Sequence, residues 1–376
     1  MSETSERGKS HQLALPEPAG KSGLVRVATL LLPLMGLALV VLLFVCSALI
    51  MRRMGYAEIE IARFFSPGSL LTVVFQTVVV AIAGLGMTFV IVSGGIDLSV
   101  GSVIAFTTVV TALALQPLPG GGHLPVWLAG VLGIVAGGLC GCCSGLMITG
   151  LRIVPFIATL GMWSIARGVA KLLSGEQKID ARESWLNDLM AKLPEEDWLT
   201  VEPSWFRAIP DKIREPIEQV VFSPGLWIMV VAVVTMWIVL RYTTFGRYTI
   251  AIGSNEPTAR LCGVRVNRTK ILIYTLAGIL TGVAGLLQFS RLTVGDPTVA
   301  AGMELDVIAA VVIGGGSLSG GEGSIMGTLI GALTMSFLRS ACDFLGWGNY
   351  VQEIFIGIFI VIYVAIDQLR RARSAA

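Results

Sequence analysis

Charged residues are scarce in this sequence. They make up 14% of its 376 residues, whereas hydrophobic residues make up 54%. Soluble domains carry about a quarter charged residues, so this composition excludes an ordinary water-soluble fold. The formal net charge of +2 is also too small to indicate a nucleic-acid partner.

Residues that bind metals or perform thiol chemistry are few. The chain has two histidines and six cysteines. Cys140, Cys142 and Cys143 lie together in a glycine-rich apolar stretch with no acidic or imidazole neighbour. Small packing residues explain this cluster better than a metal site does. We therefore expect no metal and no cofactor.

A nucleotide-binding loop is also missing. Gly8-Lys9-Ser10 and Gly20-Lys21-Ser22 end like a phosphate loop, but the glycine required five positions earlier is Glu3 in one case and Leu15 in the other. No histidine, cysteine or paired-carboxylate constellation stands within the apolar runs. The sequence predicts a non-catalytic chain, and any ATP would bind a different polypeptide.

Long apolar runs are abundant. The first extends from Ala28 to Ile50, 23 residues, which at 1.5 Å per residue crosses a hydrocarbon core of about 30 Å. The pattern predicts an all-α integral membrane protein with about ten transmembrane helices. It predicts one transmembrane domain over 26–370, a flexible tail over 1–25 and a C-terminal tail over 371–376. The further spans are expected at 69–92, 99–116, 125–149, 154–173, 224–240, 270–289, 305–317, 324–341 and 350–367.

Loop charges predict the orientation. Ten spans place both termini and the loop 241–270 on one face, and all three segments are rich in arginine and lysine. Positive loops remain cytoplasmic, so we expect both termini in the cytoplasm. The insertion 175–223 carries eleven acidic and six basic residues, which suits the external face. Arg52, Arg53 and Arg63 in the first outward loop are a local exception.

Part of this external insertion has helical spacing. Apolar side chains recur at Trp185, Leu186, Leu189, Met190 and Leu193. The spacing predicts an amphipathic helix on the membrane or on a partner. A solvated connector is the alternative.

Glycines recur at every fourth position of the span 125–149. Gly133, Gly137, Gly141 and Gly145 therefore lie on one helix face, where another backbone can approach closely. Shorter ladders occur around Gly278 and Gly327. These ladders predict packing seams in a helix bundle and do not discriminate between functions.

Two glycine-rich segments interrupt the apolar sequence. Residues 93–102 and 314–324 both contain Gly-Gly, then Leu-Ser, then Gly-Ser, which favours an internal repeat. Broken backbone at membrane depth needs a protein or water-filled interior to satisfy its polar groups. The candidate helix-break or translocation-path residues are Gly94, Gly95, Asp97, Ser99, Gly315 and Gly316.

We expect Asp97 to be the only acidic residue that lies deep among the predicted transmembrane spans. It could line a path, or it could cap the helix that begins near Ser99. Other polar side chains within the spans are possible path residues, but the sequence assigns none of them: Gln76, Thr77, Thr88, Thr107, Thr159, Ser164 and Gln288.

The basic loop contains signals for a short helix. Asn255 suits an N-cap, Glu256 and Pro257 suit the first turn, and Gly263 suits the C-terminal stop. A helix of about seven residues is unstable alone, so it should dock against a partner or against its own chain. Ala259 in its middle would permit a close partner contact, and Arg260 points elsewhere around the helix.

Three ordered segments resemble the ribose-type monosaccharide ABC transporter permeases, within the superfamily of branched-chain amino acid and simple-sugar permeases. They are 84–102, 244–264 and 304–324, and the resemblance extends over roughly 28–370. The long insertion 175–223, Ser319 and Glu322 depart from the family pattern.

The resemblance implies a permease subunit in the bacterial inner membrane that forms the path for a monosaccharide such as ribose, xylose or galactose. It implies a second permease subunit, cytoplasmic ATP-binding subunits and an extracytoplasmic sugar-binding protein. The residues that would couple to the ATPase are Asn255, Glu256, Ala259, Arg260 and Gly263. A permease for branched-chain amino acids or another small polar solute is the near alternative. An ion-coupled secondary transporter is the distant one, because such proteins carry several intramembrane ionisable groups.

Overall fold

The computed structural model describes residues 23–53, 61–118, 121–191, 214, 218 and 221–375. Helices dominate it, which confirms the predicted all-α class, and a single two-residue antiparallel pair joins β1 (Ile179–Asp180) to β2 (Val294–Gly295). The helices are α1 (Gly23–Arg53), α2 (Ile61–Phe64), α3 (Pro67–Val92), α4 (Val100–Leu115), α5 (Val126–Gly150), α6 (Pro155–Ser174), α9 (Pro224–Tyr242), α10 (Thr244–Ser254), α11 (Glu256–Leu261), α12 (Val266–Leu292), α13 (Met303–Ile313), α14 (Ile325–Phe344) and α15 (Asn349–Ala375).

Each of the ten predicted apolar runs contains a helix. Among the described residues, six helices are long and apolar enough to cross a membrane: α3, α5, α6, α9, α12 and α14. Shorter apolar helices lie within α1, α4 and α15. The 11 residues of α13 reach only about 16 Å, roughly half of a bilayer core. The count of ten spans therefore stays a prediction.

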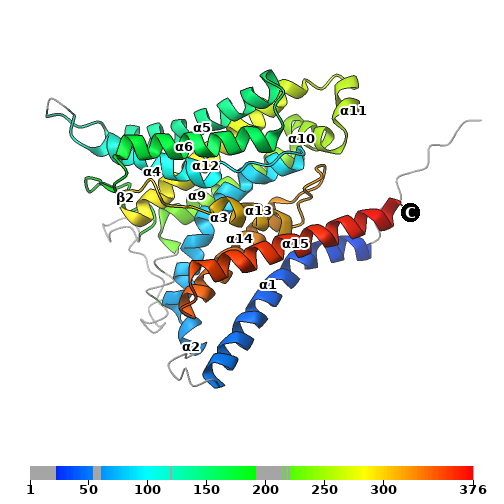
Figure 1. Cartoon of the computed structure of the whole chain (residues 1–376), viewed down its shortest axis with the longest axis horizontal. Coiled ribbons are helices and arrows are strands. Elements are labelled where there is room, and N and C mark those ends of the chain that lie inside the picture. Colours follow the sequence, from blue (N-terminus) through cyan, green and yellow to red (C-terminus); the bar gives the residue numbers. More distant parts are fainter. Residues whose placement is uncertain are drawn as a thin grey trace, which may run out of the picture.

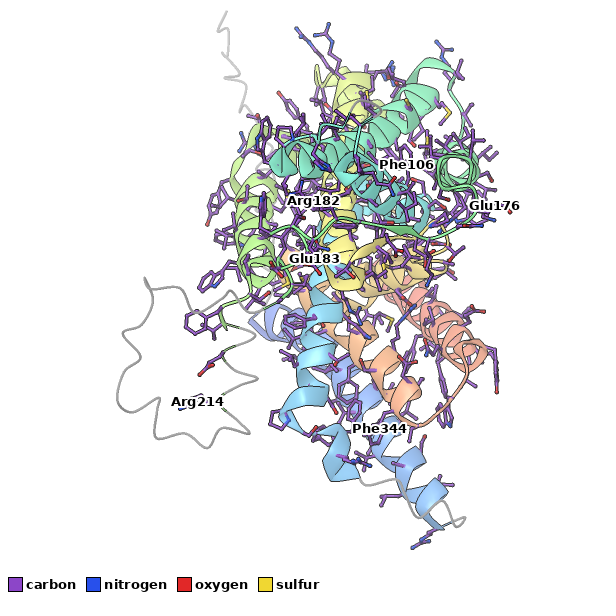
Figure 2. The ribbon with its side chains drawn as sticks, turned by 90° about the vertical axis from the view of Figure 1, so that its left-hand side faces the viewer. Phe106, Glu176, Arg182, Glu183, Arg214 and Phe344 are labelled. Atoms are coloured by element: carbon purple, nitrogen blue, oxygen red, sulfur yellow. The ribbon has the colours of Figure 1, made fainter. Side chains whose placement is uncertain are left out.

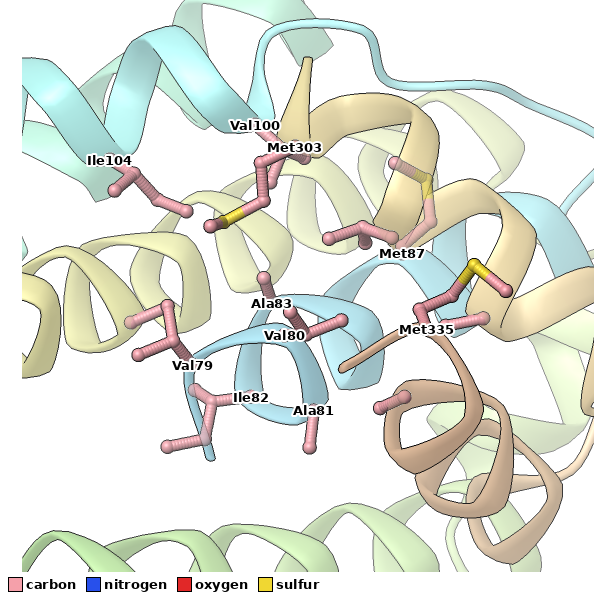
Figure 3. Packing of buried hydrophobic residues seen from close by; sticks show 14 of the residues in the cluster. Val79, Val80, Ala81, Ile82, Ala83, Met87, Val100, Ile104, Met303 and Met335 are labelled. Atoms are coloured by element: carbon pink, nitrogen blue, oxygen red, sulfur yellow. The ribbon is translucent and has the colours of Figure 1, made fainter. Parts of the chain in front are cut away.

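Helix α3 forms the centre of the bundle. All of its residues from Thr77 to Val92 are buried. Figure 3 shows Val79 to Ala83 on α3 beneath Met303 of α13, with Met335 of α14 beside them. A helix that is apolar all round must be enclosed by other helices, and α12, α14, α13 and α9 enclose this one.

The glycine ladder of α5 forms a seam with α12, as the sequence predicts. A Cβ at Gly137 would lie 2.6 Å from the Gly278 carbonyl oxygen and 2.8 Å from the Gly282 Cα. A Cβ at Gly141 would lie 2.9 Å from the Gly278 Cα. Two helix backbones can approach this closely only where the residues that face each other are glycines, which have no side chain. Among the helices that the structure describes, α5 and α12 form the most extensive pair.

The molecule has two dissimilar ends. Helices α10 and α11 lie toward the right in Figure 1, as do the first turns of α1 and the last turns of α15. Figure 2 looks at the opposite end, where Glu176, Arg182 and Glu183 follow α6. This grouping agrees with the loop arrangement expected from the charges. Which end faces the cytoplasm stays a prediction.

The insertion 175–223 does not form the predicted amphipathic helix at Trp185–Met190. Residues from Trp185 to Met190 form turns, and Leu186 packs near Gly130 of α5. The Met190 amide N–H donates to Ser290 Oγ at 2.9 Å. Leu186, Leu189 and Met190 are buried and hold the segment on the bundle, whereas Trp185 is exposed. Leu193 lies outside the described residues.

Candidate functional site

Helix α11 begins and ends where the local signals predict. The Asn255 side-chain oxygen accepts a hydrogen bond from the Thr258 N–H at 2.9 Å, which is N-cap geometry. Pro257 lies in the first turn. Gly263 has φ +85°, the left-handed conformation that follows many helix C-termini.

An ion-pair network fixes α11 to the start of α12. Glu256 accepts from Lys270 Nζ at 2.7 Å and from Arg260 Nη2 at 3.1 Å. The hydrogen bond from Lys270 is the main cause that holds the pKa of Glu256 below its ordinary value. Glu256 therefore acts as an anionic bridge between two helices as well as a first-turn residue.

The two faces of α11 differ sharply. Ala259 is only 5% exposed and packs with Ile252 of α10 and Val266 of α12. Leu261, two residues later, is 88% exposed. The small side chain of Ala259 thus serves packing within the chain, which differs from the expectation that it faces a partner. The face available to a partner carries Pro257, Thr258 and Leu261.

The first glycine-rich segment breaks the chain between α3 and α4. Gly94 has φ +81° just after α3 ends at Val92. Asp97 Oδ1 accepts from the Ser99 N–H at 2.8 Å and from Ser99 Oγ at 2.6 Å. Ser99 is the N-cap of α4. Asp97 therefore shapes the turn that leads into α4 and does not cap its first-turn amides.

The second glycine-rich segment breaks the chain between α13 and α14. Gly315 has φ +89°, and a Cβ at Gly316 would lie 2.6 Å from Val311. Helix α14 then begins with the Ser324 hydroxyl accepting from the Gly327 N–H at 3.2 Å. The predicted break is confirmed at both of its edges.

The two breaks meet at α10. The Gly321 N–H donates to the Val92 carbonyl at 2.8 Å, and a Cβ at Gly320 would lie 3.0 Å from the Cα atoms of Gly94 and Gly253. A Cβ on Gly253 of α10 would collide with the Val92 carbonyl oxygen. Both breaks are predictable from the sequence, but the role of Gly253 is not, because a single glycine in a helical run gives no sign of which backbone crosses it.

A buried tyrosine lies against the first break. A Cβ at Gly95 would collide with the hydroxyl of Tyr274 on α12, so only glycine fits there. Among the described residues, that hydroxyl has no hydrogen-bond partner. Tyr274 was not predicted as a site residue, because its position within a long apolar run resembles that of any core aromatic residue.

Asp97 is not the only deep acidic residue, so that expectation is wrong. Asp306 of α13 is 3% exposed and forms an ion pair with Arg339 of α14.

Arg167 of α6 donates to the carbonyls of Pro297 and Val299 at 2.9 and 2.7 Å. Arg167 thereby holds the loop between α12 and α13. Asp306, Arg339 and Arg167 were not predicted as site residues, because each lies inside a segment that is apolar overall.

Several candidate path residues have partners inside the protein. Thr88 Oγ1 and Thr328 Oγ1 lie 2.7 Å apart between α3 and α14, and the Ser340 hydroxyl donates to Gln76 Oε1 at 2.9 Å. Thr107 and Thr159 are fully buried. In this conformation these polar groups join helices instead of facing an open channel.

Comparison with known families gives a decisive match. The family described as "Branched-chain amino acid transport system / permease component" matches residues 69–364, from α3 to α15. This chain belongs to that family. The permease match includes both glycine-rich breaks and α11.

Relatives of this permease are similar along most of their length. The ribose import permease protein of Escherichia coli (strain K12) is 36% identical over 308 residues, which cover 82% of this chain and 88% of the relative. The fructose import permease protein of Rhizobium meliloti is 33% identical over 327 residues, 87% and 85% of the two chains. The L-arabinose ABC transporter permease protein of Azospirillum brasilense is 30% identical over 319 residues, 85% of each. No solved structure matches.

Proposed function

We propose that this permease forms the translocation path for a monosaccharide in an ABC importer. The observation that carries the proposal is the 36% identity to a ribose import permease over 82% of the chain. Relatives named for fructose and arabinose favour the same chemical class. Residues 69–364 form the conducting unit, and ATP is hydrolysed by a partner chain.

The ATPase partner binds at α11 in this proposal. Asn255, Glu256, Arg260 and Gly263 define and brace the helix, while Ala259 seats it on α10 and α12. Pro257, Thr258 and Leu261 form the contact face. One side of this six-residue helix packs on α10 and α12, and the other side is exposed. A short helix with one exposed face can bind in a groove of a second protein.

The other partners follow from the two ends of the molecule. The end with α10 and α11 faces the cytoplasm together with both termini, so the protein is a multi-pass component of the bacterial inner membrane. A sugar-binding protein docks at the opposite end, near the segment that follows α6. A second permease subunit completes the path.

The glycine-rich breaks act as hinges beside that path. Gly94 and Gly315 adopt backbone conformations that other residues resist, and Gly95 and Gly316 leave no room for a side chain. Asp97 with Ser99 stabilises the turn into α4. Hinges at membrane depth would let α4 and α14 move while α3 remains fixed in the core.

Transport by the reconstituted complex tests the function. The permease is placed in vesicles with its ATPase and binding protein, and uptake of labelled ribose, fructose, arabinose and leucine is compared. We expect ATP-dependent uptake of one or more sugars and none of leucine. Because the family description mentions branched-chain amino acids, leucine uptake without sugar uptake would favour that second function. Uptake driven by an ion gradient without ATP would overturn both.

A further inference from the structure

A basic groove lies beside α11, at the ends of α5 and α6. It has a volume of about 570 Å³ and lies between the α5–α6 connection and the start of α12. Its polar lining comprises Thr149, Arg152, Glu256, Arg260, Asn267 and Lys270. The face of α11 assigned to the ATPase does not line it, so the groove is a separate feature.

The charge of the groove is unbalanced. Three cationic side chains, Arg152, Arg260 and Lys270, line it together with the carboxylate of Glu256. Glu256 already bonds Lys270 and Arg260. Among the described residues, Arg152 forms no ion pair, and it is exposed. The groove therefore has room and positive charge for one further anion.

The walls beside the groove are apolar and exposed. Leu151, Val154 and Ile157 are 69%, 60% and 58% exposed, and Leu272 of α12 is 56% exposed. These residues continue the exposed apolar surfaces of α5, α6 and α12, which are long and apolar enough to cross a membrane. If these helices span the bilayer, the groove lies at one end of the spans, where the hydrocarbon core meets water.

We propose that this groove binds the phosphate of an anionic phospholipid, with the acyl chains along α5 and α6. Arginine and lysine are the usual partners of phosphate, and basic pockets between helices at the cytoplasmic side suit lipid headgroups. The lipid shares Lys270 and Arg260 with Glu256, so its occupancy biases the seating of α11. The proposal relies on the proposed function only for placing this end in the cytoplasmic leaflet.

Lipid binding to the purified permease tests the site without any ATPase. The protein is held in nanodiscs of phosphatidylcholine with or without phosphatidylglycerol, and retained lipid is counted by native mass spectrometry. We expect selective retention of phosphatidylglycerol. Arg152→Gln should weaken it about tenfold, the equivalent of about 1.4 kcal/mol for one charge-assisted contact. Arg182→Gln, an exposed arginine on the opposite face (Figure 2), is the matched control and should change nothing.

A second variant tests the shared network. Glu256→Gln removes the competing anion, so retention of phosphatidylglycerol should increase. Three outcomes would overturn the proposal: equal retention of both lipids by the wild type, displacement of the lipid by millimolar inorganic phosphate, or loss of ATPase binding but not of lipid in Arg152→Gln. The second would indicate a free-anion site and the third a protein contact. None of these measurements requires transport. The proposed lipid site and the proposed sugar transport can therefore be disproved independently of each other.

Discussion

At the scale of single residues, glycine determines where the helices cross. Gly253 on α10 is pressed against the Val92 carbonyl, whereas Gly161 on α6 has nothing within 4 Å of its would-be Cβ. Gly253→Ala should therefore overpack the crossing at a cost of about 1–3 kcal/mol. A thermal unfolding scan in detergent should show a lower Tm for Gly253→Ala but not for the control variant Gly161→Ala. Equal Tm values for Gly253→Ala and Gly161→Ala would contradict the assigned crossing.

Asp97 gives a second test at this scale. Its Oδ1 accepts two hydrogen bonds from Ser99, and the amide oxygen of asparagine could accept both. Asp97→Asn should retain substantial transport, whereas Asp97→Leu should lose folded protein because the Ser99 groups are left unsatisfied. Chromatographic yield and sugar uptake measure the two effects. A well-folded but inactive asparagine variant would instead place the carboxylate in the path.

Glu256 predicts a pH dependence. Its pKa is lowered in the folded state, so its contribution to stability is complete above the ordinary glutamate value and is lost as the pH falls through the lower, folded value. A spin label on the exposed native Cys262, with the other cysteines replaced by serine, should remain equally ordered from pH 7 to about pH 5. It should loosen in more acidic buffer. In Lys270→Gln, which lacks the main stabilising partner, loosening should begin at higher pH.

At the scale of elements, α11 separates packing from partner binding. Leu261→Asp adds a charge to an 88% exposed position, so the fold should persist while the ATPase is lost on copurification. Leu261→Met keeps the apolar surface and should retain the ATPase. Normal ATPase binding by the aspartate variant would exclude this face as the docking surface.

Ala259→Asp should act on the helix itself. It buries a carboxylate among Ile252 and Val266, at a cost of several kcal/mol if α11 stays docked. We expect α11 to detach from α10, with faster hydrogen exchange over Glu256–Leu261 even without the ATPase. Unchanged exchange in this variant would show that the packing tolerates the charge.

Features that depend on neighbouring residues were predictable from the sequence, whereas features that depend on contacts between distant elements were not. Caps and stops depend on neighbouring residues, so Asn255 and Gly263 revealed the limits of α11. The buried side of α11 depends on α10 and α12, which are contacts that no local signal reveals, so the burial of Ala259 was not predictable. The turns at Trp185–Met190 differ from the predicted helix for a similar reason, because the contacts of Leu186 and Met190 with the bundle override helical spacing. The apolar runs located every long helix that the structure describes, yet they could not show that the two glycine-rich breaks lie against each other.

At the scale of the whole molecule, the orientation is open to direct test. Cys262 is exposed beside α11, and Glu183 is exposed at the opposite end. In cells, native Cys262 should react only with membrane-permeant maleimide, while Glu183→Cys in a background without other cysteines should react with the impermeant reagent. Impermeant labelling of Cys262 would invert the proposed topology.

The crossing at Gly253 also limits how this chain can diverge. The Val92 carbonyl, Gly320 and Gly253 come from three distant stretches of sequence, yet they meet at one point where neither glycine has room for a Cβ atom. A larger residue in any one stretch requires the other two backbones to move, so single substitutions there cannot accumulate gradually. The outward side of α6, where Gly161 and Gly168 face open space, has no such restriction. Distant members of the family should therefore share the glycines at the crossing long after the surface of α6 has become unrecognisable.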